Sequence, residues 1–165
     1  MDKLKASSAF KLNPTQLLGV SLIIDEWNAQ GYTDDRQLAY VLGTVYHETA
    51  GRMMPIKEMG GEAYLKSKSY YPYYGRDLCQ TTWLKNYQRV KDFSGIDVVT
   101  NPDLIAEPQL AARVAIHFMS KGYYTGRKLS DFFNNTTEDY LHARRIINGL
   151  DKAEVVAEHA KKFLV

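Results

Sequence analysis

Apolar side chains recur along most of this chain at the spacing of an α-helix. The first series consists of Leu17, Val20, Ile24 and Trp27. Steps of three and four residues place such side chains on one face of a helix. Asn13-Pro14 precedes the series as a helix start, and Gly31 follows it as a stop. We therefore predict a first helix that begins at Pro14 and ends near Gly31.

The same periodicity predicts further helices along the rest of the chain. They run from about Thr33 or Asp34 to Ala50, from Thr82 to Phe93, from Pro108 to Lys121, from Thr137 to Asn148 and from Asp151 to Leu164. Between Gly51 and Gly75 the periodicity is interrupted by glycines and prolines, so we expect irregular structure with a short hairpin there. The pattern predicts a mainly α protein with one irregular lobe.

Composition agrees with one folded domain over residues 1–165. Of the 165 residues, 45% are hydrophobic and 24% are charged, which suffices for a single core. The net charge of +2 does not favour nucleic acid as a partner. The pairs Arg144-Arg145 and Lys161-Lys162 are typical of a solvated face rather than of a binding patch.

The chain shows none of the usual sequence features of export or membrane insertion. Its first residues, Met1-Asp2-Lys3-Leu4-Lys5, are polar, and no apolar h-region follows them. The apolar run from Leu17 to Ile24 is too short to span a bilayer. Cys79 is the single cysteine, so no internal disulfide can form. We expect a protein that is made in the cytosol and is a monomer, since nothing indicates a dimer.

Glu48 lies near the end of the second predicted helix, within His47-Glu48-Thr49. At about 100° per residue it projects within roughly 20° of Val41, which belongs to the apolar stripe of that helix. Burial and the negative end of the helix dipole both favour the neutral acid, so we predict a raised pKa. A carboxyl group that stays protonated near neutral pH can act as general acid on a glycosidic oxygen. The alternative is a structural glutamate paired with Arg52 or Arg113.

A glycosidase that uses Glu48 as its acid needs a second carboxylate. Glu58 and Glu62 are the candidates, and both lie in the irregular stretch after the helix. In an inverting hydrolase the two carboxyl groups lie about 6.5–9.5 Å apart, so that a water molecule fits beside the sugar. A loop that folds back over the helix end would meet this distance.

The segment from Tyr70 to Tyr87 combines aromatic, hydroxyl and amide side chains. Aromatic faces pack against the C–H faces of sugar rings while their polar tips stay hydrated. Gln80, Thr82 and Asn86 can form hydrogen bonds with hydroxyl and N-acetyl groups. The alternative is a packed tyrosine-rich turn followed by an ordinary helix start.

Several short motifs follow one another in a fixed order between Val41 and Gly149. They are His47-Glu48-Thr49-Ala50-Gly51, Pro55-Ile56-Lys57-Glu58, Tyr73-Tyr74-Gly75-Arg76, Gln80-Thr81-Thr82, Asn86-Tyr87, Asn101-Pro102-Asp103-Leu104 and Arg145-Ile146-Ile147-Asn148-Gly149. Together they resemble glycoside hydrolase family nineteen, which includes plant-type chitinases and many phage endolysins. The resemblance implies a mainly α, lysozyme-like single catalytic domain of two lobes, with a central cleft and a small irregular or β lobe. It also implies hydrolysis of β-1,4 bonds between N-acetylated sugars with inversion.

The resemblance assigns roles to individual residues. It makes Glu48 the general acid, Glu58 the base and Thr82 the hydroxyl that helps to hold the attacking water, with Glu62 as the alternative base. The side chains that it places against the substrate are His47, Glu62, Tyr74, Arg76, Gln80, Asn86, Tyr87 and Asn148. It implies no metal and no cofactor. Asp77 and Thr81 depart from the family, which usually has glycine and leucine at these positions.

The secreted chitinases that this chain resembles carry signals and disulfides, whereas phage endolysins do without them. We therefore expect the substrate to be the glycan strands of peptidoglycan, cut between N-acetylmuramic acid and N-acetylglucosamine by a lysozyme (muramidase) that lyses bacteria. Such an enzyme would reach the wall in the periplasm after a separate holin-type protein has opened the membrane. Chitin is the alternative substrate.

Two other classes of protein remain open. A zinc amidase is one, because His47-Glu48 begins the HExxH pattern, but Gly51 stands where the second histidine belongs. His117, His142 and His159 also lack the spacing of zinc ligands. A non-catalytic glycan-binding domain is the other, since it would use the same aromatic segment without acid chemistry.

Overall fold

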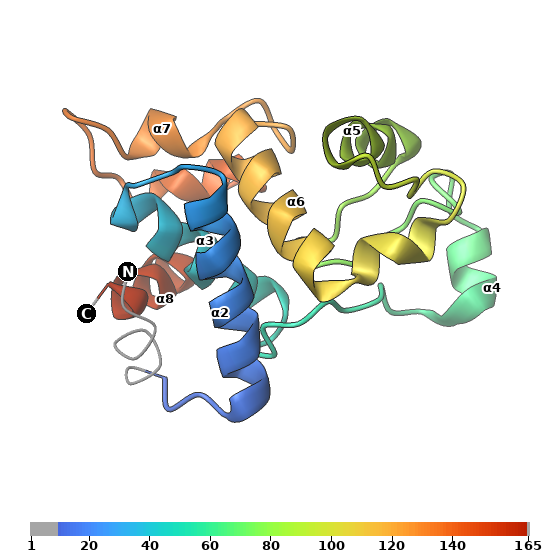
Figure 1. The fold of residues 1–165 in the computed structure, drawn as a ribbon, viewed down its shortest axis with the longest axis horizontal. Coiled ribbons are helices and arrows are strands. Elements are labelled where there is room, and N and C mark those ends of the chain that lie inside the picture. The colour runs from blue at the N-terminus through green and yellow to red at the C-terminus, as the bar shows by residue number, and fades with distance from the viewer. Residues whose placement is uncertain (1–9, 165) are drawn as a thin grey trace.

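The computed structural model describes residues 10–164, and this part of the chain is mainly helical (Figure 1). Its α-helices are α2 (Pro14–Ala29), α3 (Asp35–Glu48), α4 (Gly61–Lys66), α5 (Leu84–Ser94), α6 (Pro108–Lys121), α7 (Leu129–Phe132) and α8 (Ala153–Phe163). Two 3₁₀ helices accompany them, η1 (Pro102–Ala106) and η2 (His142–Ile146). The β structure assigned within residues 10–164 is an isolated antiparallel bridge between Phe133 and Glu138. The mainly α prediction is confirmed, and no β lobe is present in the described residues.

Side-chain caps fix where the first two helices begin. The Asn13 side chain accepts a hydrogen bond from the Gln16 amide (2.9 Å), and the Gln16 side chain accepts one from the Asn13 amide (2.8 Å). This reciprocal pair satisfies two amides that the first helical turn cannot. At the start of α3 the Asp34 carboxylate accepts from the Arg36 amide (2.9 Å). Both predicted helix starts are confirmed to within a residue or two.

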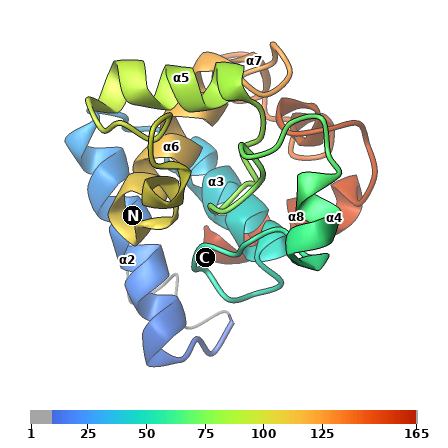
Figure 2. The same cartoon turned by 90° about the vertical axis from the view of Figure 1, so that its right-hand side faces the viewer.

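Helix α3 is buried on all sides over most of its length. Every residue from Leu38 to Val45 is buried, so the helix has no solvated face along this stretch. Figures 1 and 2 both place it in the middle of the larger group of helices, beside α2 and α8. Gly43 permits the closest approach, because a Cβ at that position would lie 2.5 Å from the backbone nitrogen of Ala160 in α8. The helix that carries Glu48 is therefore held rigidly from several directions.

In residues 10–164 the buried apolar side chains form two clusters, and α6 contributes to both. Ala111, Ala115 and Met119 of α6 pack into the larger cluster with α2, α3 and α8. Val114 and Phe118 of the same helix pack into the smaller cluster with Tyr87 and Val90 of α5 and with Val98. The smaller lobe, made of α5 and the chain before α6, therefore shares a helix with the larger one (Figure 1).

The prediction of a helix from Thr137 to Asn148 is wrong. Only η2 forms there, and the residues before it make a bridge and a turn. The Asn134 side chain accepts hydrogen bonds from the amides of Thr136 (2.9 Å) and Thr137 (3.0 Å). The Asp139 side chain accepts one from the His142 amide (2.9 Å). Such side chain–backbone bonds compete with helical ones and turn the chain instead.

The irregular structure predicted between Gly51 and Gly75 is confirmed, apart from the short helix α4. The short hairpin expected in this stretch is wrong, because no strand or bridge is assigned there. Within residues 10–164 no helix is both long and apolar enough to cross a membrane.

Replacing Gly43 with alanine should lower the free energy of unfolding by about 1–3 kcal/mol, because the added methyl group overlaps the backbone of α8. Urea denaturation followed by far-UV circular dichroism measures this change. Gly149→Ala is the matched control, since a Cβ there meets nothing within 4 Å. An equal loss of stability in both variants would contradict close packing of α3 on α8.

Candidate active site

Glu48 is the last residue of α3, and its carboxylate is paired with a buried arginine. Arg144 Nη1 donates to Glu48 Oε1 over 2.7 Å, and the two side chains are 5% and 21% exposed. The prediction that Arg52 or Arg113 pairs with Glu48 is wrong, because the partner is Arg144. Arg113 pairs with Glu26 instead, with 3.8 Å between Arg113 Nε and Glu26 Oε2. The positive charge of Arg144 and its hydrogen bond to Glu48 compensate for the partial burial of the Glu48 side chain. Glu48 thus lies at the edge of the core, with part of its surface open to solvent.

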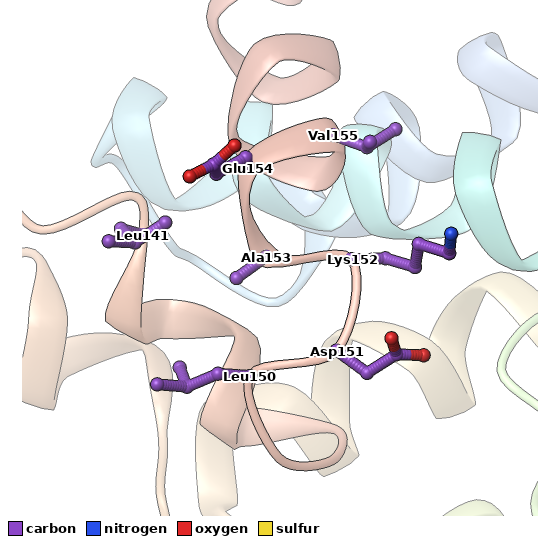
Figure 3. Close-up of a pocket in the computed structure, with 7 residues that line it drawn as sticks. All are labelled: Leu141, Leu150, Asp151, Lys152, Ala153, Glu154 and Val155. Carbon is purple, nitrogen blue, oxygen red and sulfur yellow. The ribbon is translucent and has the colours of Figure 1, made fainter.

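Arg144 connects this carboxylate to the segment before α8. Its Nε donates to the backbone oxygen of Asp151 over 3.0 Å. Asp151 lines a surface pocket of about 460 Å³, which Figure 3 shows with the exposed leucines Leu141 and Leu150 and the first residues of α8. One guanidinium therefore fixes both the end of α3 and a wall of this pocket.

Glu58 lies in the irregular segment and is held by three hydrogen bonds. Its amide donates to the Gly75 oxygen (2.8 Å), and the Gly75 amide approaches Glu58 Oε2 (3.4 Å). The hydroxyl of Tyr70 donates to Glu58 Oε1 in a short hydrogen bond. Since this bond stabilises the protonated phenol, it raises the pKa of Tyr70 to about 12. The loop therefore orients the carboxylate of Glu58.

Glu62, the alternative base, has a more open setting. It stands in the first turn of α4, where its carboxylate accepts from the Tyr71 hydroxyl (3.0 Å) and lies 4.0 Å from Lys66 Nζ. Its side chain is 54% exposed. Exposed pairs of this kind contribute little to stability, so Glu62 is free to change conformation.

Gln80, Thr82 and Asn86 form one hydrogen-bonded turn. Gln80 has a φ of +56°, and its side-chain amide donates to the Ile56 oxygen over 2.6 Å. The Thr82 hydroxyl donates to the Gln80 oxygen (2.8 Å), and the Asn86 amide donates to the Thr82 oxygen (3.0 Å). Gly75 makes room for this turn, because a Cβ there would lie 2.6 Å from Gln80 Oε1. Strained positions of this type are found where a protein clamps a ligand.

Tyr74, Arg76 and Tyr87 are buried together. The Arg76 guanidinium lies 3.6 Å from the centre of the Tyr74 ring, and its Nη1 donates to the Tyr87 hydroxyl (3.1 Å). Tyr87 donates in turn to the Tyr74 backbone oxygen in a short hydrogen bond. Tyr74 is 5% exposed and Tyr87 is fully buried. The Arg76 guanidinium and the Tyr87 hydroxyl are engaged in these contacts and the two rings are buried, so in this conformation they support the segment.

His47 and Asn148 are the two remaining residues that were predicted to contact the substrate. His47 is half-buried, with its ring 6.3 Å from that of His159 in α8. Asn148 is exposed, and its amide donates to the Arg144 oxygen over 3.1 Å. Asn148 is therefore joined by one backbone hydrogen bond to the residue that pairs with Glu48.

Sequence reasoning missed three residues around these carboxylates. Arg144 was interpreted as half of a solvated basic pair, yet it is 4% exposed while Arg145 is exposed. Tyr70 was counted only among the tyrosines of its segment. Trp83, with φ +79°, is 52% exposed and meets Tyr70 edge to face at 5.5 Å. The signal in the sequence for this last residue was a tryptophan directly after Thr82, within the aromatic segment from Tyr70 to Tyr87.

Side chains that could bind a metal ion do not come together in residues 10–164. No three His, Cys, Asp or Glu side chains in this range are grouped so that they could hold a metal ion.

The sequence relatives and the structural neighbours described next are named chitinases. No protein-family model matches the chain. Chitinase 11 of Oryza sativa subsp. japonica is 39% identical over 93 residues, which is 52% of this chain and 36% of the relative. Endochitinase A2 of Pisum sativum is 30% identical over 105 residues, or 52% of this chain and 32% of the relative. The chain thus spans about a third of the length of these curated relatives.

Solved structures match a larger share of the chain. A bacterial family 19 chitinase superposes with a TM-score of 0.61 at 18% identity, over 99% of this chain and 95% of that one. The family GH19, class IV chitinase from Zea mays gives a TM-score of 0.57 at 21% identity, over 90% and 81%. The chain is thus similar in sequence to plant chitinases over about half of its length and shares its fold with family 19 chitinases. Its helices have the lysozyme-like family 19 arrangement, as the sequence motifs indicated.

Arg144→Met should lower the free energy of unfolding by about 1–3 kcal/mol, because it leaves the partly buried Glu48 without its counter-charge. Arg145→Met, at the exposed neighbour, should change it by less than about 0.5 kcal/mol. In a double-mutant cycle, Glu48→Gln should cost less in the Arg144→Met background than in the wild type. Additive losses in urea denaturation would show that the ion pair does not contribute to stability.

Proposed function

We propose that this protein is a glycoside hydrolase that cleaves β-1,4 bonds in glycans of N-acetylglucosamine, with chitin as the main candidate substrate. The observation that carries the proposal is the placement of Glu48, partly exposed and held by Arg144, at the end of a helix that is buried over most of its length. The relatives above are named chitinases, and this favours chitin over peptidoglycan as the first substrate to test.

In the proposed reaction, the protonated Glu48 carboxyl donates its proton to the glycosidic oxygen as the bond to the anomeric carbon breaks. A water molecule attacks that carbon from the opposite face, and Glu58 takes up the proton that the water loses. The hydroxyl of Thr82 gives its hydrogen to the Gln80 oxygen, so it accepts a hydrogen bond from this water. Arg144 stabilises the carboxylate that Glu48 becomes. Attack from the opposite face inverts the anomeric configuration.

Peptidoglycan is the second candidate substrate. Its strands contain N-acetylated sugars in β-1,4 linkage and carry negative charge. Basic side chains lie around Glu58 and α4, with Lys57 5.4 Å from the Tyr74 ring centre and Lys68 4.2 Å from that of Tyr64. This positive charge favours an anionic polymer. In this case the protein would act on the bacterial wall and would need a separate holin-type protein to reach it.

Glu48→Gln should reduce kcat by about 10²–10⁴-fold on the preferred glycan, since the amide keeps the shape of the side chain but cannot donate the proton. Hydrolysis of chito-oligosaccharides and of purified peptidoglycan, with mass analysis of the new reducing ends, measures this loss and identifies the bond that is cut.

Glu58→Gln should cause a similar loss, whereas Glu62→Gln is the matched control and should keep most of the activity. A larger loss in Glu62→Gln than in Glu58→Gln would make Glu62 the base. Cleaved stem peptides or full activity in Glu48→Gln would refute the proposed function, and a retained anomer in NMR spectra would refute inversion.

Trp83 provides a test of binding that does not require turnover. The chain has two tryptophans, and Trp27 is 1% exposed while Trp83 is 52% exposed. We expect Trp83 to stack on a sugar ring, so chito-oligosaccharides should protect the fluorescence of Glu48→Gln protein from acrylamide quenching. Trp83→Phe in the same background should abolish the change. If peptidoglycan fragments protect the Trp83 fluorescence at lower concentration than chito-oligosaccharides do, peptidoglycan becomes the main candidate substrate and chitin the second.

A further inference from the structure

Asp77 is a buried carboxylate that the proposed reaction does not use. It is 1% exposed, with Oδ1 accepting from the Thr81 amide (2.8 Å) and Oδ2 from the Thr81 hydroxyl (2.6 Å). Burial raises the pKa of Asp77, and the two hydrogen bonds from Thr81 act against this rise. Removing a carboxylate from water is unfavourable unless it is hydrogen-bonded. Asp77 and Thr81, the two departures from the family pattern, are therefore bound to each other.

The hydrogen bonds continue from Thr81 to Tyr124. The two hydroxyl oxygens lie 2.9 Å apart, and because Thr81 gives its one hydroxyl hydrogen to Asp77, Tyr124 donates to Thr81. Tyr124 follows α6 and packs against both hydrophobic clusters. Asp77, Thr81 and Tyr124 thus form a unit, here called the Asp77 unit, that attaches the loop to the place where the two clusters meet.

The backbone of Asp77 joins this unit to Glu58. The Asp77 oxygen accepts from the Ile56 amide (3.3 Å), and two residues further on the Glu58 amide donates to the Gly75 oxygen. The Gln80 side chain completes the connection by donating to the Ile56 oxygen (2.6 Å). A displacement of Asp77 would therefore move the segment that carries Glu58.

The other end of the unit fixes Thr82. Thr81 lies between Gln80, which has a positive φ, and Thr82, whose hydroxyl donates to the Gln80 oxygen (2.8 Å). Holding the amide and hydroxyl of Thr81 on Asp77 therefore sets the conformation of this turn. The same three side chains thus determine where Glu58 and Thr82 stand relative to each other.

We propose that the Asp77 unit is a positioning device that sets the separation between the carboxylate of Glu58 and the hydroxyl of Thr82, the two groups that hold and activate water. This inference rests on the proposed function. None of the three side chains contacts the substrate, and they act through the backbone segments that they connect. A shift of about 1 Å in such a group can reduce a rate by about 10²-fold.

Thr81→Val tests the unit, because it keeps the volume of the side chain and removes the hydroxyl that joins Asp77 to Tyr124. We expect kcat to fall by about 10- to 100-fold, with KM within a factor of about two, since the groups that touch sugar remain. Thr81→Ser restores the hydroxyl and should restore kcat to within a factor of about three of the wild type.

Thr100→Val is the matched control. The Asp97 carboxylate accepts from the Thr100 amide (3.0 Å) and hydroxyl (2.8 Å) in the same arrangement, but on the exposed surface. This variant should leave kcat and KM unchanged. A loss of stability in Thr81→Val without a fall in kcat would overturn the inference and give the unit a purely structural role. Equal falls in Thr81→Val and Thr81→Ser would also overturn it, because keeping the hydroxyl in Thr81→Ser would then not be enough to position Glu58 and Thr82.

Hydrogen exchange gives a measurement that does not depend on the substrate. In Thr81→Val the amides of Ile56 and Glu58 should exchange faster than in the wild type, while those of α3 should not change. Unchanged exchange at both amides would overturn the inference even if the protein is active. If Thr81→Val shows the expected faster exchange but wild-type protein cleaves no glycan, the proposed function fails and the physical connection stands. Tyr124→Phe removes the last donor of the unit, and carries the same expectations if Thr81→Val does not fold.

Discussion

The pairing of Glu48 with Arg144 is the interaction on which the rest of the site depends. Helix α3 runs through the core and is buried over most of its length, so its end can carry a carboxylate only where a positive charge and some solvent are available. Arg144 supplies that charge, and its second hydrogen bond to Asp151 ties the start of α8 to the same point. Helix α8 also packs on α3 at Gly43. The ion pair and the helix packing therefore stabilise the same placement of α8 against α3.

The two carboxylates of the proposed reaction are held in different ways. Glu48 belongs to a rigid helix, whereas Glu58 belongs to a segment without regular structure. That segment is nevertheless defined by hydrogen bonds, from Tyr70 to the carboxylate and between the backbone of residues 56–58 and 75–77. Hydrogen bonds of this kind between partly buried groups restrict the conformation of the segment. A loop can therefore position a reactive group when side chains take over the role that a sheet would play.

Local signals in the sequence were enough to predict the main helices. Asn13-Pro14 predicted the start of α2, and the bounds predicted for α6 are those of the structure. The ordered motifs also predicted the family 19 fold. The partner of Glu48 could not be predicted, because Arg144 lies 96 residues further along the chain. A hydrogen bond between such distant residues follows from tertiary packing, which periodicity does not describe. The helix predicted from Thr137 failed because Asn134 and Asp139 bind nearby amides, a competition that apolar spacing does not reveal.

The position of α6 has a consequence for the mechanics of the molecule. Since one helix supplies apolar side chains to both clusters, the two lobes cannot swing apart about α6 without breaking contacts in each core. Motion between the lobes is therefore confined to the segments on either side of that helix, and above all to the stretch between α3 and α5. A shared helix also joins the stability of the two clusters, so that heat or denaturant should melt them in one cooperative transition and not in two successive steps.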